Sequence, residues 1–184
     1  MMINLGDFKG TFGDPEPSTG VPLVALHLEQ QPFLEKFERE IGNGVFLHGA
    51  FSVASVREQG LDLEPWMHLL PAGSRHFATN SIGELFFVAP DQKLYFLMIH
   101  SGEATELQTS PDEFFAWLTR PRNEGLYAAL GQFHAEPRRL RPKQILTYEP
   151  PVALGGAEEP DALVAIEASD ALARLAGIHF DNEK

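Results

Sequence analysis

The stretch between residues 76 and 109 constrains the fold most, because it carries four apolar, aromatic-rich segments separated by very short turns. The expected strands are His76–Thr79, Glu84–Ala89, Leu94–His100 and Thr105–Thr109. The turn residues between them are Asn80-Ser81-Ile82-Gly83, Pro90-Asp91-Gln92 and Ser101-Gly102. Such short connections join antiparallel neighbours, since a parallel pair needs a long crossover. We therefore predict a meander whose third strand, apolar at nearly every position, is central and covered on both faces.

Upstream of this meander the chain is punctuated by glycine and proline. Residues 1–22 contain four glycines and three prolines, which predicts an irregular arm. The expected elements that follow are a helix over Gln31–Ile41, a hairpin over Val45–Leu47 and Phe51–Ala54, and a loop or short helix over Leu61–Leu70. Pro71-Ala72-Gly73 is the best candidate for a boundary between two parts of the chain. We expect a small N-terminal subdomain, residues 1–72, docked on a C-terminal domain, residues 73–184.

Downstream of the meander the signals are mainly helical. Ser110-Pro111-Asp112-Glu113 has the residues of a capping box, with proline suited to the first helical position, and predicts a helix reaching Leu118. Further expected elements are a helix over Asn123–Phe133, a strand or helix start over Asp161–Ile166, and a last helix over Ser169–Ala176, capped by Ser169. The predicted fold class is α+β: a mostly antiparallel sheet with packed helices and a small docked N-terminal subdomain.

Composition narrows the class of protein. The chain has 184 residues, no cysteine and a net charge of −12, so disulfides and thiolate metal sites are excluded. An acidic chain is repelled by phosphate backbones, so we expect no nucleic-acid partner. No apolar run approaches the roughly 20 residues that span a bilayer, so no membrane partner is expected. The first residues lack the pattern of a signal peptide, which favours a cytoplasmic location.

The charge is unevenly distributed. The segment Arg120 to Lys143 carries six basic and two acidic residues and is therefore +4. This basic strip could bind an anion, or it could be a solvated face that pairs with the acidic remainder of the chain. Few aromatic residues are interleaved with it, which argues against a surface that stacks nucleic-acid bases. Its role stays open at this stage.

A search for chemistry finds no recognisable catalytic or metal-binding pattern. None of the seven histidines forms a His-x-His or His-x-x-x-His pair, and there is no nucleophile elbow, P-loop or dinucleotide fingerprint. Neighbouring acids such as Glu158 and Glu159 are of the kind that is usually solvated. The sequence therefore predicts a non-enzymatic protein without cofactor or metal, with a small-molecule enzyme assembled from scattered residues as an alternative.

The order of several short motifs resembles a bacterial family. In the first half, Phe12-Gly13, Val21-Pro22 and Gly44-Val45-Phe46-Leu47-His48-Gly49-Ala50-Phe51 resemble a GAD-like domain. In the second half, the stretch from Phe77 to Phe86, the helix Ser110 to Leu118 and Pro150-Pro151-Val152-Ala153-Leu154-Gly155-Gly156 resemble the C-terminal domain of type VI secretion immunity proteins, which are related to the broader SUKH group. The resemblance implies binding and neutralising a cognate toxin, which in some members is a DNA-degrading effector. A regulatory or scaffold protein of the same fold is the alternative.

Binding to such a toxin is expected to use loops, because loops tolerate change on a constant scaffold. Our candidate partner-binding residues are Glu64, Trp66, Asp91 and Glu103. Trp66 would be a desolvated anchor, and the three acids would meet positive groups on the toxin. This hypothesis requires the loops to share one face. The competing interpretation, favoured for Trp66 itself, makes the tryptophan part of the core and leaves the acids solvated.

Overall fold

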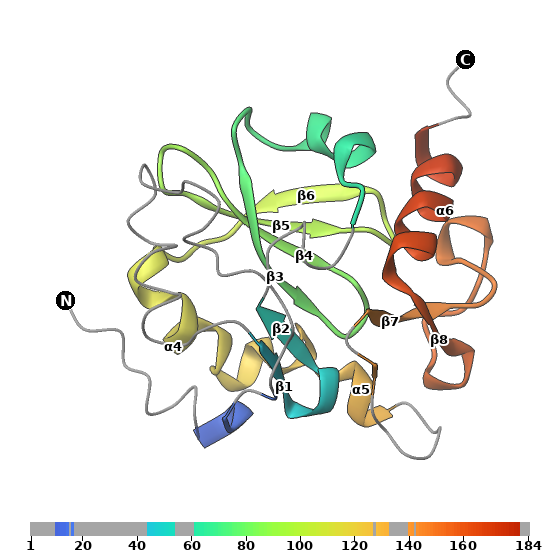
Figure 1. Ribbon diagram of the computed structural model, residues 1–184, viewed down its shortest axis with the longest axis horizontal. Coiled ribbons are helices and arrows are strands. Elements are labelled where there is room, and N and C mark those ends of the chain that lie inside the picture. The colour runs from blue at the N-terminus through green and yellow to red at the C-terminus, as the bar shows by residue number, and fades with distance from the viewer. Residues whose placement is uncertain are drawn as a thin grey trace.

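The computed structural model (Figure 1) describes residues 10–14, 16, 44–53, 61–126, 128–132, 140–141 and 143–180. Its main feature is a six-stranded antiparallel sheet in which every strand pairs with its neighbours in sequence. The strands are β1 (Gly44–Phe46), β2 (Phe51–Val53), β3 (Arg75–Asn80), β4 (Leu85–Val88), β5 (Leu94–Met98) and β6 (Glu103–Glu106). The predicted hairpin and four-strand meander are therefore confirmed, and with them the α+β class. The expected central position of the third meander strand is wrong, because β5 lies next to the edge strand β6 and the middle of the sheet is β3 and β4.

The sheet is covered on both faces because its strands are apolar on both sides. In β4, Phe86 and Val88 join one buried cluster, whereas Leu85 and Phe87 join the other. The first cluster also contains the aromatic residues of α4 (Phe114–Leu118). The second contains apolar residues of the 3-10 helix η3 (Glu64–Leu69) and of α6 (Ala168–Phe180). The result is three layers, with α4 and α6 on different sides of the sheet (Figure 1).

The remaining regular elements are short. A second, two-stranded antiparallel sheet consists of β7 (Gln144–Tyr148) and β8 (Leu163–Glu167). The other helical elements are η2 (Leu47–Gly49), η4 (Pro111–Glu113), η5 (Pro121–Leu126), α5 (Ala129–Gln132), η6 (Val152–Leu154) and η7 (Pro160–Ala162). In the part of the chain that the structure describes, no helix is both long and apolar enough to cross a membrane.

The turn between β3 and β4 joins the two sheets. The backbone N–H of Leu146 in β7 donates to the carbonyl of Ser81, at 2.6 Å. Gly83 has a φ of +77°, and a Cβ there would lie 2.3 Å from Cδ1 of Ile145. Only glycine combines that conformation with so close an approach. The β3–β4 turn therefore fixes where β7 and its loop sit against the main sheet.

Several expected boundaries shift. β6 begins at Glu103 rather than Thr105, and α6 begins at Ala168, so Ser169 lies within the helix instead of capping it. Ser110 holds the N-cap position of η4 but makes no side-chain capping bond, because its first turn is a 3-10 turn closed by the backbone bond from Glu113 to Ser110. Strand β7 was not predicted. The expected helix over Gln31–Ile41 lies outside the described residues.

The expected boundary at Pro71-Ala72-Gly73 falls between two strands of one sheet. β2 pairs directly with β3 through Phe51 and Asn80, Ser52 and Thr79, and Val53 and Ala78. The described part of the first half is thus hydrogen-bonded into the sheet of the second half. The division into residues 1–72 and 73–184 stays a prediction, but the two parts share a sheet.

Candidate functional site

Trp66 lies in the core. Its side chain is 0% exposed, and its ring packs edge-on against Phe180 of α6 at a centroid distance of 5.1 Å and against His179 at 5.9 Å. The interpretation of Trp66 as an exposed anchor is therefore wrong, and the core interpretation is confirmed. The reason is the long-range packing of α6 over η3, which a local stretch of sequence does not reveal.

The three acidic candidates are exposed, but two of them lie at opposite ends of a strand. Asp91 is in the turn that precedes β5, and Glu103 begins β6, where it pairs with Met98 at the far end of β5. A strand of five residues separates the two turns by about 17 Å. Successive turns of an antiparallel meander alternate between the two ends of the sheet, so Asp91 and Glu103 are not brought together.

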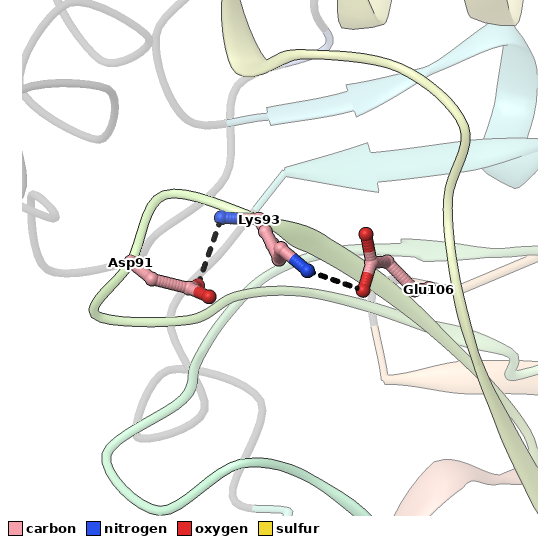
Figure 2. A network of polar contacts seen from close by, with 3 residues as sticks. All are labelled: Asp91, Lys93 and Glu106. Atoms are coloured by element: carbon pink, nitrogen blue, oxygen red, sulfur yellow. Dashed lines mark hydrogen bonds and ion pairs between the residues drawn. The ribbon is translucent and has the colours of Figure 1, made fainter.

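Figure 2 shows that Asp91 acts mainly within its own turn. Its carboxylate accepts a hydrogen bond from the backbone N–H of Lys93, at 3.2 Å. The ammonium group of Lys93 in turn donates to Glu106 of β6, at 2.8 Å (Figure 2), and this bond raises the pKa of Lys93. The pair is exposed, so it contributes little to stability. This network shapes the β4–β5 turn and offsets part of the negative charge there.

The most distinctive surface segment is the loop between β7 and β8, residues 149–162, here called the β7–β8 loop. Its two ends meet where Tyr148 pairs with Leu163 and where the N–H of Glu149 donates to the carbonyl of Ala162, at 2.9 Å. Arg174 of α6 clamps the first residue of the loop, with Nη1 and Nη2 donating to the two oxygens of Glu149 at 2.5 and 3.0 Å. The bond to Arg174 lowers the pKa of Glu149. Compact loops of this length with closed ends are frequently functional.

Two glycines determine the path of this loop. Gly155 ends η6 in the left-handed conformation, with a φ of +88°. Gly156 passes so close to the chain before η6 that a Cβ would lie 1.8 Å from the carbonyl oxygen of Pro150. Its N–H donates to the carbonyl of Pro151, at 3.1 Å. The motif Pro150 to Gly156, which carries the resemblance, is therefore a tightly folded turn.

A group of ionisable side chains lies within electrostatic range of Glu158 in this loop. Glu84 follows the β3–β4 turn, and burial raises its pKa from 4.5 to about 7, against a hydrogen bond from Asn80 that lowers it. Burial also lowers the pKa of His100 and raises that of Tyr148, whose ring meets His100 edge-on at 5.1 Å. The charge of Glu158 in the β7–β8 loop raises the pKa of all three groups. The loop and this cluster are thus electrostatically coupled.

Asn80, Glu84 and one nitrogen of His100 have structural partners, whereas Nδ1 of His100 is buried without a hydrogen-bond partner among the described residues. Asn80 Nδ2 donates to Glu84 at 2.7 Å and to the carbonyl of Leu126 at 2.8 Å, which joins the β3–β4 turn to η5. His100 Nε2 is 3.0 Å from the carbonyl oxygen of Ile82, so this nitrogen carries the proton of the neutral ring. These contacts stabilise the turn. A carboxyl group with a pKa near 7 is also what general acid–base catalysis uses.

A small pocket lies beside the cluster, between the two sheets. Its volume is about 20 Å³, room for about one water molecule. Its polar lining includes Ser52, Thr79, Asn80, Arg141, Lys143 and Gln144. Within the described ranges, no group of three or more histidine and acidic side chains could hold a metal ion.

Four members of the basic strip are exposed: Arg120, Arg122, Arg141 and Lys143. The guanidinium group of Arg141 lies 4.0 Å from the carboxylate of Glu167.

No protein-family model and no curated protein matches the chain. Among solved structures, the fold is similar to the crystal structure of Atu4351 from Agrobacterium tumefaciens. The TM-score is 0.69 at 16% sequence identity, and the match covers 94% of this chain and 88% of the other. At this identity the likeness defines a shared α+β fold over nearly the whole chain.

Two features of this site were missed from sequence. From the sequence, residues 150–157 contribute only to the resemblance, although they form a visible run of eight residues without a polar side chain. The raised pKa of Glu84 had no local signal, since burial of that carboxyl depends on packing between the β3–β4 turn and neighbouring elements.

Proposed function

We propose that this chain is an immunity-type protein that binds a cognate bacterial toxin in the cytoplasm and neutralises it by steric occlusion. The observation that carries the proposal is the form taken by the motif Pro150 to Gly156. This motif, the most specific part of the resemblance to type VI secretion immunity proteins, is a tightly folded surface loop. Such a loop presents a fixed surface to a partner protein.

The distribution of charge supports a basic partner. Residues 144–173, which comprise β7, the β7–β8 loop, β8 and the start of α6, contain six acidic residues and no lysine or arginine. Glu158, Glu159 and Asp161 are exposed in the loop itself. A one-signed surface accelerates encounter with an oppositely charged partner by about 10–10³-fold at low salt. Affinity would come from close, desolvated contacts rather than from this long-range field.

A small-molecule enzyme is the second candidate, because Glu84 has a pKa of about 7 beside His100 and Tyr148. Perturbed carboxyl groups of this kind occur at catalytic sites and also in structural networks. Two hydrogen bonds between Glu84 and Asn80, and a third from Asn80 to the carbonyl of Leu126, favour the structural role. Glu84→Gln separates the two: an immunity protein keeps its protection, whereas an enzyme that uses Glu84 as acid or base loses its activity.

The leading proposal predicts an effector gene beside the gene for this chain, and its test is co-expression with the toxin domain of that effector. We expect wild-type protein to restore growth of a susceptible bacterium and to form a stable complex with a catalytically inactive toxin domain in vitro. A toxin domain from an unrelated effector is the specificity control. Failure of the wild-type chain to protect or to bind would reject the immunity function and favour the regulatory alternative.

A further inference from the structure

The β7–β8 loop exposes a continuous segment of apolar residues. Residues 150–157, Pro-Pro-Val-Ala-Leu-Gly-Gly-Ala, include no polar side chain. By comparison, the apolar run from Leu85 to Ala89 is entirely buried in the sheet. Within the loop only Pro151 is buried. The three apolar residues of η6, Val152, Ala153 and Leu154, are partly or fully exposed. Apolar surface of this kind, rimmed by polar residues, marks sites of protein association.

Leu154 is the most exposed part of this surface. Its side chain is 62% exposed. Among the described residues, the other exposed large apolar side chain is Leu47, at 44%. Leu154 is the last residue of η6, at the tip of the loop. A single exposed leucine is ordinary in a protein surface. Here it stands in the middle of a continuous apolar segment, which is a suitable place for an anchor residue.

The backbone holds Leu154 in place before any partner arrives. The N–H of Leu154 donates to the carbonyl of Pro151, and that of Gly155 to the carbonyl of Val152, both at 2.9 Å. The close packing of Gly156 on Pro150 leaves no space between the two arms of the turn. Preorganised contacts bind more tightly because less conformational entropy is lost on association.

The rim of this apolar surface is acidic. Glu158 and Glu159 follow the apolar segment directly, and both are exposed. Glu149 at the other end is already neutralised by Arg174. A partner surface complementary to this arrangement has an apolar recess for Leu154, bordered on one side by lysine or arginine.

We propose that the β7–β8 loop is the toxin-binding surface, with Leu154 as its apolar anchor and Glu158 and Glu159 as the acidic rim that meets basic groups of the toxin. This inference rests on the proposed immunity function and deepens it. It replaces the set of Glu64, Trp66, Asp91 and Glu103 predicted from the sequence, because Trp66 is buried and Asp91 and Glu103 lie at opposite ends of β5. Glu64 is exposed in η3, but the tryptophan that it would have flanked is in the core.

The test uses full-length variants and the catalytically inactive toxin domain of the neighbouring effector that the proposed function predicts. Calorimetry measures the affinity, and stopped-flow mixing measures the association rate. Leu154→Ala is expected to weaken binding at least about 30-fold, the loss that defines a binding hot spot. Leu154→Asp should weaken it further. Leu47→Ala and Leu47→Asp are the matched controls, since Leu47 is exposed but lies in η2, and they should bind as wild type. Thermal melts should show all four variants folded.

Charge reversal tests the rim. Glu158→Lys and Glu103→Lys change the net charge equally, but Glu158 lies in the β7–β8 loop next to its apolar segment, whereas Glu103 lies on β6. We expect Glu158→Lys to slow association more than Glu103→Lys does, because steering depends on charge close to the contact.

Three results would overturn the inference. If wild type binds and Leu154→Asp binds equally well, the toxin contacts another surface and only the immunity function survives. If wild type does not bind the toxin, both proposals fail together. If Leu154→Asp instead dissociates a self-associated form of this chain in sedimentation, with toxin binding intact, then the loop contacts a second copy of the chain.

Discussion

The carboxyl group of Glu84 makes a quantitative prediction about stability. Its pKa is about 7 in the folded protein, against an ordinary value of 4.5, because burial disfavours the charged form. The informative change is Glu84→Gln. Glutamine keeps an oxygen that can accept the 2.7 Å bond from Asn80 Nδ2, and it cannot ionise.

The magnitude follows from the difference between the folded and unfolded pKa. Each pKa unit corresponds to about 1.4 kcal/mol, so a rise of about 2.5 corresponds to about 3 kcal/mol. The folded state binds the proton more tightly, so this contribution to stability is complete below about pH 4.5. It is lost as the pH rises toward 7 and is absent above pH 7. Glu84→Gln should therefore match wild type near pH 4.5 and exceed it by up to about 3 kcal/mol at pH 8.

The assay is urea unfolding followed by tryptophan fluorescence at pH values from 4.5 to 8.5. The measured quantity is the difference in unfolding free energy between variant and wild type, in which the titration of all other groups cancels. Glu158→Gln is the control, because it removes only a neighbouring charge that raises the pKa of Glu84, and it should reproduce a minor part of the effect. A difference that stays constant across this pH range would refute the assignment of a raised pKa to Glu84.

Four further expectations follow from the geometry. Trp66→Ala should cost about 3–5 kcal/mol of stability in chemical unfolding, as for a large core aromatic, and a smaller loss would contradict its burial. Gly156→Ala should cost about 1–3 kcal/mol or more, because its Cβ would overlap the carbonyl of Pro150, whereas Gly131→Ala, with nothing within 4 Å, should cost nothing. Burial lowers the pKa of His76 from 6.5 to about 4, so wild type should lose up to about 3 kcal/mol as the pH falls between those values, and His76→Gln should show a flatter acid limb. Association with the proposed toxin should slow as salt rises from 0.01 to 0.1 M, because the Debye length falls from about 30 to about 10 Å. An association rate that does not change would exclude electrostatic steering.

The main sheet was predictable because its signals are local. Strands β3, β4 and β5 are dense in aromatic and aliphatic residues, and turn residues separate them by only a few positions. Strand β7 was missed because its partner β8 lies more than a dozen residues away, across the β7–β8 loop. No adjacent hairpin turn marks it, so its pairing depends on the tertiary fold.

The candidate site was less predictable for a related reason. The Pro-Pro and Gly-Gly pairs within residues 150–157 indicate an irregular segment, but they do not show that its apolar side chains lie mostly at the surface, unlike those of Leu85–Ala89. The difference arises from the backbone conformation of Gly155 and the close approach of Gly156, which turn the segment back on itself. The reverse holds for Trp66: its local surroundings are compatible with exposure, and α6, a hundred residues later, buries it.

The pairing of β2 with β3 bears on how such chains can recombine. Phe51 and Val53 are fully buried, and a slip of one residue against β3 would turn both toward the opposite face of the sheet. A front half exchanged between relatives must therefore preserve that register to yield a folded hybrid. The two parts of the chain therefore depend on each other to fold, whereas the surface loops tolerate substitution more readily than the paired strands do.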